Sequence, residues 1–376
     1  MTRALSIHAD YRCQNTGVCC SSGWDVPVEP GIEEGLREAL AGGSLRAPAA
    51  ASCFRPVAGL PHGARVVFQN DDRGRCVFLG SGDRPLCSVH HQLGPGSLAS
   101  ACRDFPRIVT LSPLGVSITL SHHCPTAAGL LFSEQNGLAI VRDPPAFPSS
   151  RPYEGLDARE SFSPLLRPGV LMGWDAYARF EEHAVATLAR DELSPEEALG
   201  LLVARAEAAR GWRPEDGAFD GHLERCLREA PFVQVERPSR AESLRAWRVV
   251  ASCVPAGHPH PSPPLEGDSR SGGSESGEWG QLGGPVRRWL AARAFASWMA
   301  LQGEGLRTTV GALSLSLEVL RAEAARDTGE GTSPLGAPRL HEAFRRADLL
   351  LVHLADPEAL ARRLSQGEAV AGQTSW

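Results

Sequence analysis

The sequence predicts an α+β protein, mainly α, in which a small metal-organised cysteine-cluster domain precedes a helical C-terminal region. All but two of the ten cysteines lie before residue 125, whereas helical periodicity and capping motifs dominate after residue 170. A Pro-rich stretch at 142–152 has the composition of a connector. We therefore expect a metal-binding domain over residues 1–140 and a helical domain over residues 141–376.

The N-terminal part shows little regular periodicity. Alternating apolar residues predict strands at 64–69 and 114–121, and apolar residues at helical spacing predict a helix at 32–40. The loops between these segments carry many of the cysteines. This pattern is typical of a domain that is organised by metal as much as by an apolar core.

The C-terminal part is predicted to be helical. Ser194, Pro195 and Glu197 form a capping box with Pro at the first helical position. Residues 310–325 fit both a strand and a helix, and residues 254–283 are rich in Pro, Gly and Ser, which predicts a flexible loop. The helices expected from apolar spacing or start signals lie at 172–190, 194–210, 240–253, 285–302 and from 356 onward.

Composition excludes several functions. The chain has 376 residues, 42% of them hydrophobic, so two ordinary domains with sizeable cores are possible. A net charge of −6 gives no basic surface for nucleic acid and no polybasic membrane patch. Every basic residue other than histidine is Arg, which excludes a Schiff-base lysine and a phosphate-loop lysine. Nothing in the composition fixes the oligomeric state.

The N-terminal residues lack the apolar segment and cleavage site of a signal peptide. No apolar run reaches the length that spans a bilayer. We therefore expect a cytoplasmic protein with no membrane partner, whose thiols stay reduced and available to metal.

Seven cysteines of the first third form the candidate metal site. Thiolates at this density in a reducing compartment are better explained as soft-metal ligands than as disulfides, and an alternative is a set of inert buried thiols. Seven thiols exceed the four ligands of one tetrahedral ion, which favours an iron–sulfur cluster, for example of the 4Fe–4S type, or a pair of metals over one zinc ion. The candidate ligands are Cys13, Cys19, Cys20, Cys76, Cys87, Cys102 and Cys124.

The spacing of these cysteines sets constraints on the site. Gly and Pro residues between Cys76 and Cys87 suit a turn. Adjacent residues in an extended chain point to opposite sides, so Cys19 and Cys20 are expected to share one ion only if the chain is not extended there. Otherwise one of them binds while the other supports, or two metals are present.

Other residues near the cysteines have candidate roles. His90, His91, His122 and His123 are possible nitrogen ligands. Three arginines adjoin cysteines and would lower the pKa of a neighbouring thiol, namely Arg12, Arg75 and Arg103. Trp24, Phe105 and Pro106 either shield the site from water or pack in an ordinary core. Cys53 is expected to be a free or buried thiol, and Cys226 and Cys253 are expected to be core residues on predicted helices.

Several of these segments resemble known cysteine-cluster proteins. RCQNTGVCC, RCVFLGSGDRPLCSV and ACRDFP resemble the YkgJ-type family of zinc- or iron-chelating domains. A closer resemblance is to the flagellin lysine-N-methylase (FliB-like) family. It lies in the two adjacent cysteines followed by Gly and Trp at 19–26, in the Leu-Gly to Cys-Arg-Asp-Phe-Pro-Arg segment at 93–107, and in SHHCP at 121–125.

The resemblance implies an iron–sulfur or other cysteine-bound metal centre. In its closer form it implies S-adenosylmethionine-dependent methylation of lysines on a protein substrate such as flagellin. The sequence does not indicate where S-adenosylmethionine would bind or which residues would be catalytic. The alternative function is a non-catalytic, zinc-stabilised protein-interaction module.

Overall fold

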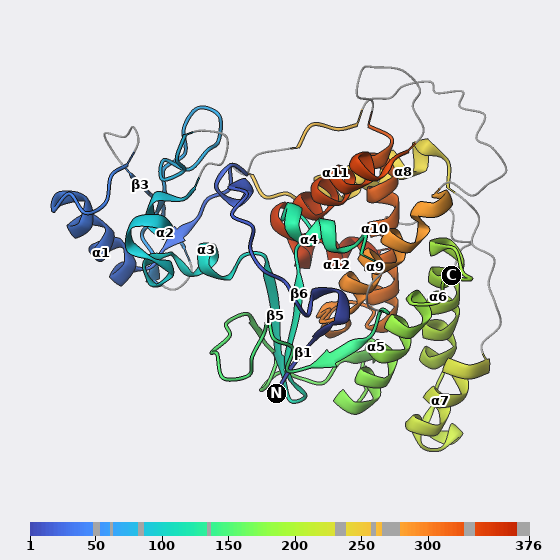
Figure 1. Cartoon of the computed structure of the whole chain (residues 1–376). Coiled ribbons are helices and arrows are strands. Elements are labelled where there is room, and N and C mark those ends of the chain that lie inside the picture. Colours follow the sequence, from blue (N-terminus) through green and yellow to red (C-terminus); the bar gives the residue numbers. More distant parts are fainter. Residues whose placement is uncertain are drawn as a thin grey trace. The chain divides into compact units, whose positions relative to one another are not determined.

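Helices predominate in the structure, a computed structural model that describes most of the chain. The described residues are 1–47, 53–60, 63–81, 86–133, 137–229, 238–256, 261–264, 279–326 and 335–366. Most of the loop predicted at 254–283 lies outside them. The α+β class is confirmed, since helices and strands both occur and helices are the larger part (Figure 1).

The chain forms two compact units that interleave along the sequence. We call residues 1–11, 108–123 and 127–376 the helical unit, and residues 12–107 with 124–126 the cysteine unit. The sequence predicted one boundary near residue 140, whereas the contacts assign two N-terminal segments to the helical unit. Those two segments carry strands that pair with each other, β1 (Thr2–Leu5) and β6 (Gly115–Leu120).

A mixed sheet contains the N-terminal segments of the helical unit. Its strand order is β7-β1-β6-β5-β8, with β5 at Arg107–Ser112, β7 at Ile140–Arg142 and β8 at Leu156–Asp157 (Figure 1). β1 runs parallel to β6, and Thr2 pairs with Val116. It runs antiparallel to β7 on its other side. β6 confirms the strand predicted at 114–121.

The helices of this unit pack around one long, buried helix, α10. α10 (Leu306–Ala324) contacts α6, α8 and α11. A short hairpin, β9 (Leu165–Arg167) with β10 (Val170–Leu171), also belongs to this unit. The other helices are α4 (Pro125–Leu130), α5 (Trp174–Leu188), α6 (Pro195–Arg210), α7 (Phe219–Glu229), α8 (Arg240–Ala251), α9 (Gly283–Ala294), α11 (Ala337–Asp348) and α12 (Pro357–Ser365).

The helix starts follow from capping chemistry. At α6 the Ser194 side chain accepts a hydrogen bond from the Glu197 backbone N–H (3.1 Å), and the Glu197 carboxylate accepts one from the Ser194 N–H (2.8 Å). Asp356 caps α12 by accepting from the Ala359 N–H at 2.6 Å. The capping box predicted for 194–210 and the start predicted at 356 are both confirmed.

Two predictions needed the tertiary structure to resolve them. The helix predicted at 285–302 ends at Ala294, because Phe295 is extended and Ala296 has a positive φ of 59°. The ambiguous stretch 310–325 is helical and lies within α10, which is buried over most of its circumference. A helix buried all round has no polar face, so its apolar residues also satisfy the alternating pattern of a strand.

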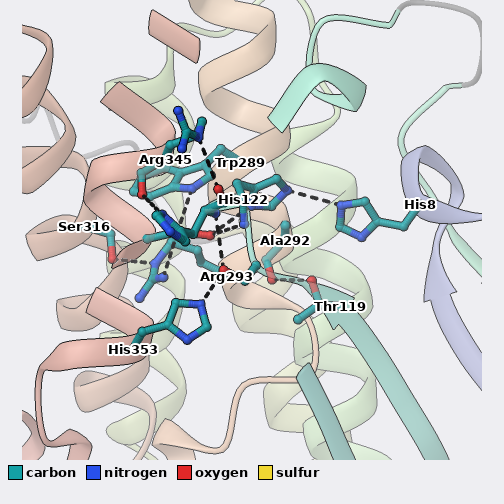
Figure 2. A network of polar contacts seen from close by, with 12 residues as sticks. His8, Thr119, His122, Trp289, Ala292, Arg293, Ser316, Arg345 and His353 are labelled. Atoms are coloured by element: carbon teal, nitrogen blue, oxygen red, sulfur yellow. Dashed lines mark hydrogen bonds and ion pairs between the residues drawn. The ribbon is translucent and has the colours of Figure 1, made fainter. Parts of the chain in front are cut away.

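A buried carboxylate, that of Asp348, joins three parts of the helical unit. Its partners His122, Trp289 and Arg293 are labelled in Figure 2. The carboxylate accepts hydrogen bonds from the backbone N–H of His122 (2.5 Å), from Nδ1 of His122 (3.2 Å) and from the Trp289 indole N–H (3.0 Å). Arg293 Nη1 is its fourth donor at 3.4 Å. Arg293, on helix α9, is therefore the ionic partner of Asp348.

These contacts keep Asp348 ionised inside the unit. Burial by itself would raise the pKa of Asp348, but the hydrogen bonds and charge of His122, together with the charge of Arg293, outweigh it and lower the pKa to about 2. A carboxyl with a folded-state pKa below its unfolded value contributes stability above the unfolded pKa. That contribution is lost as the pH falls through the folded pKa.

The cysteine unit has its own small sheet and core. β2 (Pro27–Val28) and β3 (Phe54–Pro56) pair antiparallel with β4 (Val66–Phe68), which confirms the strand predicted at 64–69. α1 (Pro30–Ala41) confirms the helix predicted at 32–40. Two short helices follow, α2 (Ser88–Leu93) and α3 (Ser100–Asp104). The core is built around the rings of Phe54, Phe68 and Phe78, whose centroids lie 5.3 to 6.3 Å apart.

Of the helices that the structure describes, none has both the length and the hydropathy required to cross a bilayer.

Replacing Asp348 by Asn is expected to lower the free energy of unfolding at pH 7 by about 3 kcal/mol, because Arg293 and His122 lose a buried charge partner. Urea denaturation at several pH values measures this. The difference from the wild type should shrink as the pH falls towards 2, where the native carboxyl also becomes neutral.

The matched control is Asp191→Asn. Asp191 also pairs with a buried arginine, Arg287 at 2.6 Å, but its side chain is 90% exposed. A surface pair is worth roughly 1 kcal/mol or less. Equal losses in the two variants would contradict the role assigned to Asp348.

Candidate metal centre

Five of the seven predicted cysteine ligands interact electrostatically within the cysteine unit. They are Cys19, Cys20, Cys76, Cys87 and Cys102. All five are partly buried. They come from four segments of the chain, so the fold of this unit, rather than local spacing, brings them together. We call these five residues the thiol cluster.

A tight turn positions the first two thiols. Cys19 and Cys20 lie in a 3₁₀ turn, Val18–Cys20, which begins after Gly17 at a positive φ of 72°. Their sulfur atoms are 3.9 Å apart. Two thiolates at about 2.3 Å from one tetrahedral ion stand about 3.8 Å from each other. Because the chain turns here instead of extending, the restriction expected for an extended pair does not apply, and these sulfurs have the spacing of ligands to one ion.

The loop that carries Cys76 is held directly against this turn. The Cys76 N–H donates to the carbonyl of Cys20 at 2.7 Å. Gly23 and Gly74 meet beside this hydrogen bond with positive φ values of 74° and 72°, and a Cβ on Gly74 would lie 3.3 Å from Cα of Gly23. The close backbone approach therefore depends on glycine at both positions.

A backbone bridge pairs the segment before Cys87 with the segment after Cys76, and the turn predicted between these two cysteines falls largely on residues 82–85, outside the described residues. Leu79 and Cys87 form an isolated antiparallel bridge, and the Gly80 N–H donates to the Leu86 carbonyl at 2.9 Å. Cys87 then precedes α2 as its N-cap residue.

Cys102 lies in α3, beside a carboxylate that the sequence did not point to. Glu29 accepts a hydrogen bond from the Ser100 N–H at 3.1 Å, and so anchors the start of α3. Burial raises the pKa of the Cys102 thiol well above its usual value, and the nearby charges of other cysteines and of Glu29 raise it further. Glu29 is 71 residues before Ser100, and no local motif predicts this contact.

Hydrogen bonds among Cys19, Cys20 and Cys87 shift the pKa values of these three thiols in different directions. The hydrogen bond with Cys20 lowers the pKa of Cys87 to about 6, against the effect of burial, and the backbone N–H groups of His90 and Val89 lower it further. The same kind of bond lowers the pKa of Cys19. In turn, the hydrogen bonds with Cys19 and Cys87 raise the pKa of Cys20. Cys20 therefore holds its proton more firmly than Cys19 and Cys87 do.

Burial dominates at the fourth thiol. It raises the pKa of Cys76 to about 12, and the charges of Cys87, Cys19 and Cys53 add to the shift, while a hydrogen bond from the Phe78 backbone opposes it. Cys53, expected to be a free or buried thiol, is buried in the core of this unit. The cluster thus contains thiols that resist ionisation because they are buried and lie near other groups that become anionic.

The other two predicted ligands have different surroundings. Cys13 is exposed, and its sulfur interacts with the side-chain oxygen and the backbone N–H of Asn15 at 3.6 and 3.4 Å. Cys124 is buried and belongs to the cysteine unit. Their role as ligands stays a prediction. None of the ten cysteines forms a disulfide.

The four histidines considered as ligands fall into two pairs, of which His90 and His91 follow Cys87 in the cysteine unit and His122 and His123 lie in the helical unit. His90 and His91 are exposed on α2. Both ring nitrogens of His122 have partners within the helical unit, since Nδ1 contacts Asp348 and Nε2 lies 3.3 Å from Nε2 of His8. His123 Nδ1 lies 3.2 Å from the Arg345 carbonyl. The sequence could not separate these histidines from ligands, because their partners are distant in the chain.

Three predicted neighbours of the cysteines, Arg75, Trp24 and Phe105, have interaction partners of their own. Arg75 forms an exposed ion pair with Asp71 at 2.9 Å, so its charge is engaged there. Trp24 and Phe105 pack against each other with ring centroids 5.4 Å apart, as either predicted role would allow.

Within the described part of the chain, no three His, Cys, Asp or Glu side chains already have the arrangement of a formed metal site. The thiol cluster contains five sulfur atoms within one unit, and two of them, those of Cys19 and Cys20, lie 3.9 Å apart. This donor set fits zinc or an iron–sulfur cluster, both of which take thiolate ligands.

No family model, no curated protein and no solved structure matches this chain. The resemblance to the YkgJ-type and flagellin lysine-N-methylase families therefore stays a prediction.

Replacing Gly74 by Ala is expected to lower the free energy of unfolding by about 1 kcal/mol or more, because the new Cβ strains a left-handed residue and meets Gly23. Thermal or chemical denaturation measures the change. Gly35→Ala is the control, since a Cβ there meets nothing within 4 Å in helix α1 and should stabilise by up to about 1 kcal/mol. Opposite signs are expected, and a neutral Gly74→Ala would contradict the close approach.

Proposed function

We propose that the cysteine unit is a metal-binding domain in which the thiol cluster holds an iron–sulfur cluster, with zinc as the alternative. The observation that carries this proposal is the gathering of five thiols from four separate segments. Five thiols exceed the four ligands of a single tetrahedral ion, which is why we favour a centre with more than one metal atom.

The electrostatics of the thiols support this proposal. Hydrogen bonds with Cys19 and Cys87 raise the pKa of Cys20, and burial raises the pKa values of Cys76 and Cys102. These thiols are neutral when protonated, and as thiolates they would repel one another unless a cation accompanied them. Metal binding supplies that cation and releases the protons, which couples metal affinity to folding.

The sulfur spacing indicates how the ligands would be shared. Cys19 and Cys20, at 3.9 Å, would bind the same metal atom. Cys76, Cys87 and Cys102 would supply the remaining thiolates. A bound iron–sulfur cluster would provide electron transfer, whereas bound zinc would provide folding energy.

A zinc-stabilised interaction module is the non-catalytic form of the same proposal. Its support is the modest regular structure of this unit, whose three strands, β2, β3 and β4, are two or three residues long. A domain with such short strands gains more from a metal than one with an extensive sheet.

The methyltransferase activity implied by the resemblance to flagellin lysine-N-methylases remains a separate prediction. Calorimetry with S-adenosylmethionine on the anaerobically purified protein tests it, and absence of binding would argue against it.

Anaerobic purification followed by iron, sulfide and zinc analysis tests the metal proposal. We expect bound metal near stoichiometry, with a brown colour for an iron–sulfur cluster and a colourless protein for zinc. Cys76→Ser should lower the metal content at least two-fold, because serine supplies no thiolate. The control, Cys226→Ser, changes a thiol of the helical unit that contacts His222 at 3.3 Å, and should leave the metal content unchanged.

Sub-stoichiometric iron and zinc in every anaerobic preparation would overturn the proposal. Equal metal loss in the Cys76 and Cys226 variants would overturn the assignment of the site to the thiol cluster.

A further inference from the structure

The helical unit contains a pocket that has no part in the thiol cluster. Its volume is about 200 Å³. Strands β5 and β6, helices α9, α10 and α12, and the segments after α9 and α11 contribute to its wall. Much of the lining is apolar, including Leu120, Phe295, Trp298, Met299, Leu313 and Leu351. An apolar wall with few polar groups is typical of a small-molecule site.

Most of the polar side chains on the wall are already occupied. The Thr119 hydroxyl donates to the Ala292 carbonyl at 3.0 Å, and the Thr309 hydroxyl donates to the Gly305 carbonyl at 3.4 Å. The two oxygens of Asp348 receive four hydrogen bonds from His122, Trp289 and Arg293. A carboxylate has about four acceptor positions, so Asp348 has none left for a ligand amine.

Arg293 is different, because it has donors to spare (Figure 2). Its Nε donates to Ser316 at 2.8 Å and its Nη1 to Asp348 at 3.4 Å. A guanidinium has five N–H donors, and these two bonds use two of them. Arg293 lies in the pocket wall with its side chain 15% exposed. The charge of Arg293 is paired with Asp348, but the remaining N–H donors of its poorly hydrated guanidinium are free to bind a ligand in the pocket.

We propose that this pocket binds a compact apolar carboxylate, with the carboxylate group on Arg293 and the apolar body against Phe295 and Leu313. A guanidinium fork matches a carboxylate through two parallel hydrogen bonds. The size also agrees, since an apolar cavity of about 150 Å³ accommodates benzene, and this pocket is somewhat larger. A single-ring or branched-chain acid fits this volume. The proposal is independent of the metal centre.

Calorimetric titration of the full chain with benzoate, benzyl alcohol and benzylamine tests the proposal. The three probes share one ring and differ in the charge of the polar group. We expect saturable benzoate binding, at least ten-fold weaker binding of benzyl alcohol, and no binding of benzylamine. In Arg293→Gln, benzoate should lose its advantage over benzyl alcohol, because the charged fork is gone.

A pair of variants at Ala312 locates the site. Ala312 lies in the wall on α10, so Ala312→Phe should fill the pocket and reduce benzoate affinity at least ten-fold, while Ala312→Ser should retain it. Circular dichroism checks that both variants are folded. If Ala312→Phe does not fold, the ranking of the three probes on the wild-type chain decides. Absent benzoate binding, equal binding of benzylamine, or equal affinity in two folded Ala312 variants would overturn the proposal.

Discussion

Burial of the Asp348 carboxylate is the constraint on which the helical unit depends. An ionised carboxylate is buried without penalty only if its acceptor positions are filled. Here the donors come from the end of β6 and from helix α9, far apart in the sequence. Asp348 thereby fixes how α11 and α9 meet the sheet. The same arrangement uses only two of the five N–H donors of Arg293. The remaining donors give the pocket beside it hydrogen-bonding capacity in addition to its apolar lining.

The cysteine unit meets the opposite situation. Its clustered thiols are all anionic when charged, and burial raises the pKa of Cys76 and Cys102 instead of stabilising thiolates. Arg75, which adjoins Cys76 in the sequence, is paired with Asp71 rather than with a thiol. A metal cation is the natural counter-charge for such a cluster. This contrast with Asp348 is the physical reason for assigning metal binding to this unit.

Much of the fold was predictable because its signals are local. The capping box at Ser194 and Glu197 and the alternation at 114–121 depend on residues a few positions apart, and both predictions were confirmed. The end of α9 was not predictable, because it depends on the conformations of Phe295 and Ala296 within the packed unit. Helix α10 was ambiguous because complete burial removes the polar face that identifies a helix.

The sequence by itself predicted the class of the candidate site, since thiols at this density in one third of the chain indicate soft-metal chemistry. It also determined the α+β class. Only the tertiary structure decided that the sulfur atoms of Cys19 and Cys20 lie close together in a turn, and that His122 is hydrogen-bonded to Asp348. It also decided that Glu29 lies near Cys102. These contacts join residues through backbone geometry or across long stretches of chain, and spacing in a sequence carries no information about such convergence.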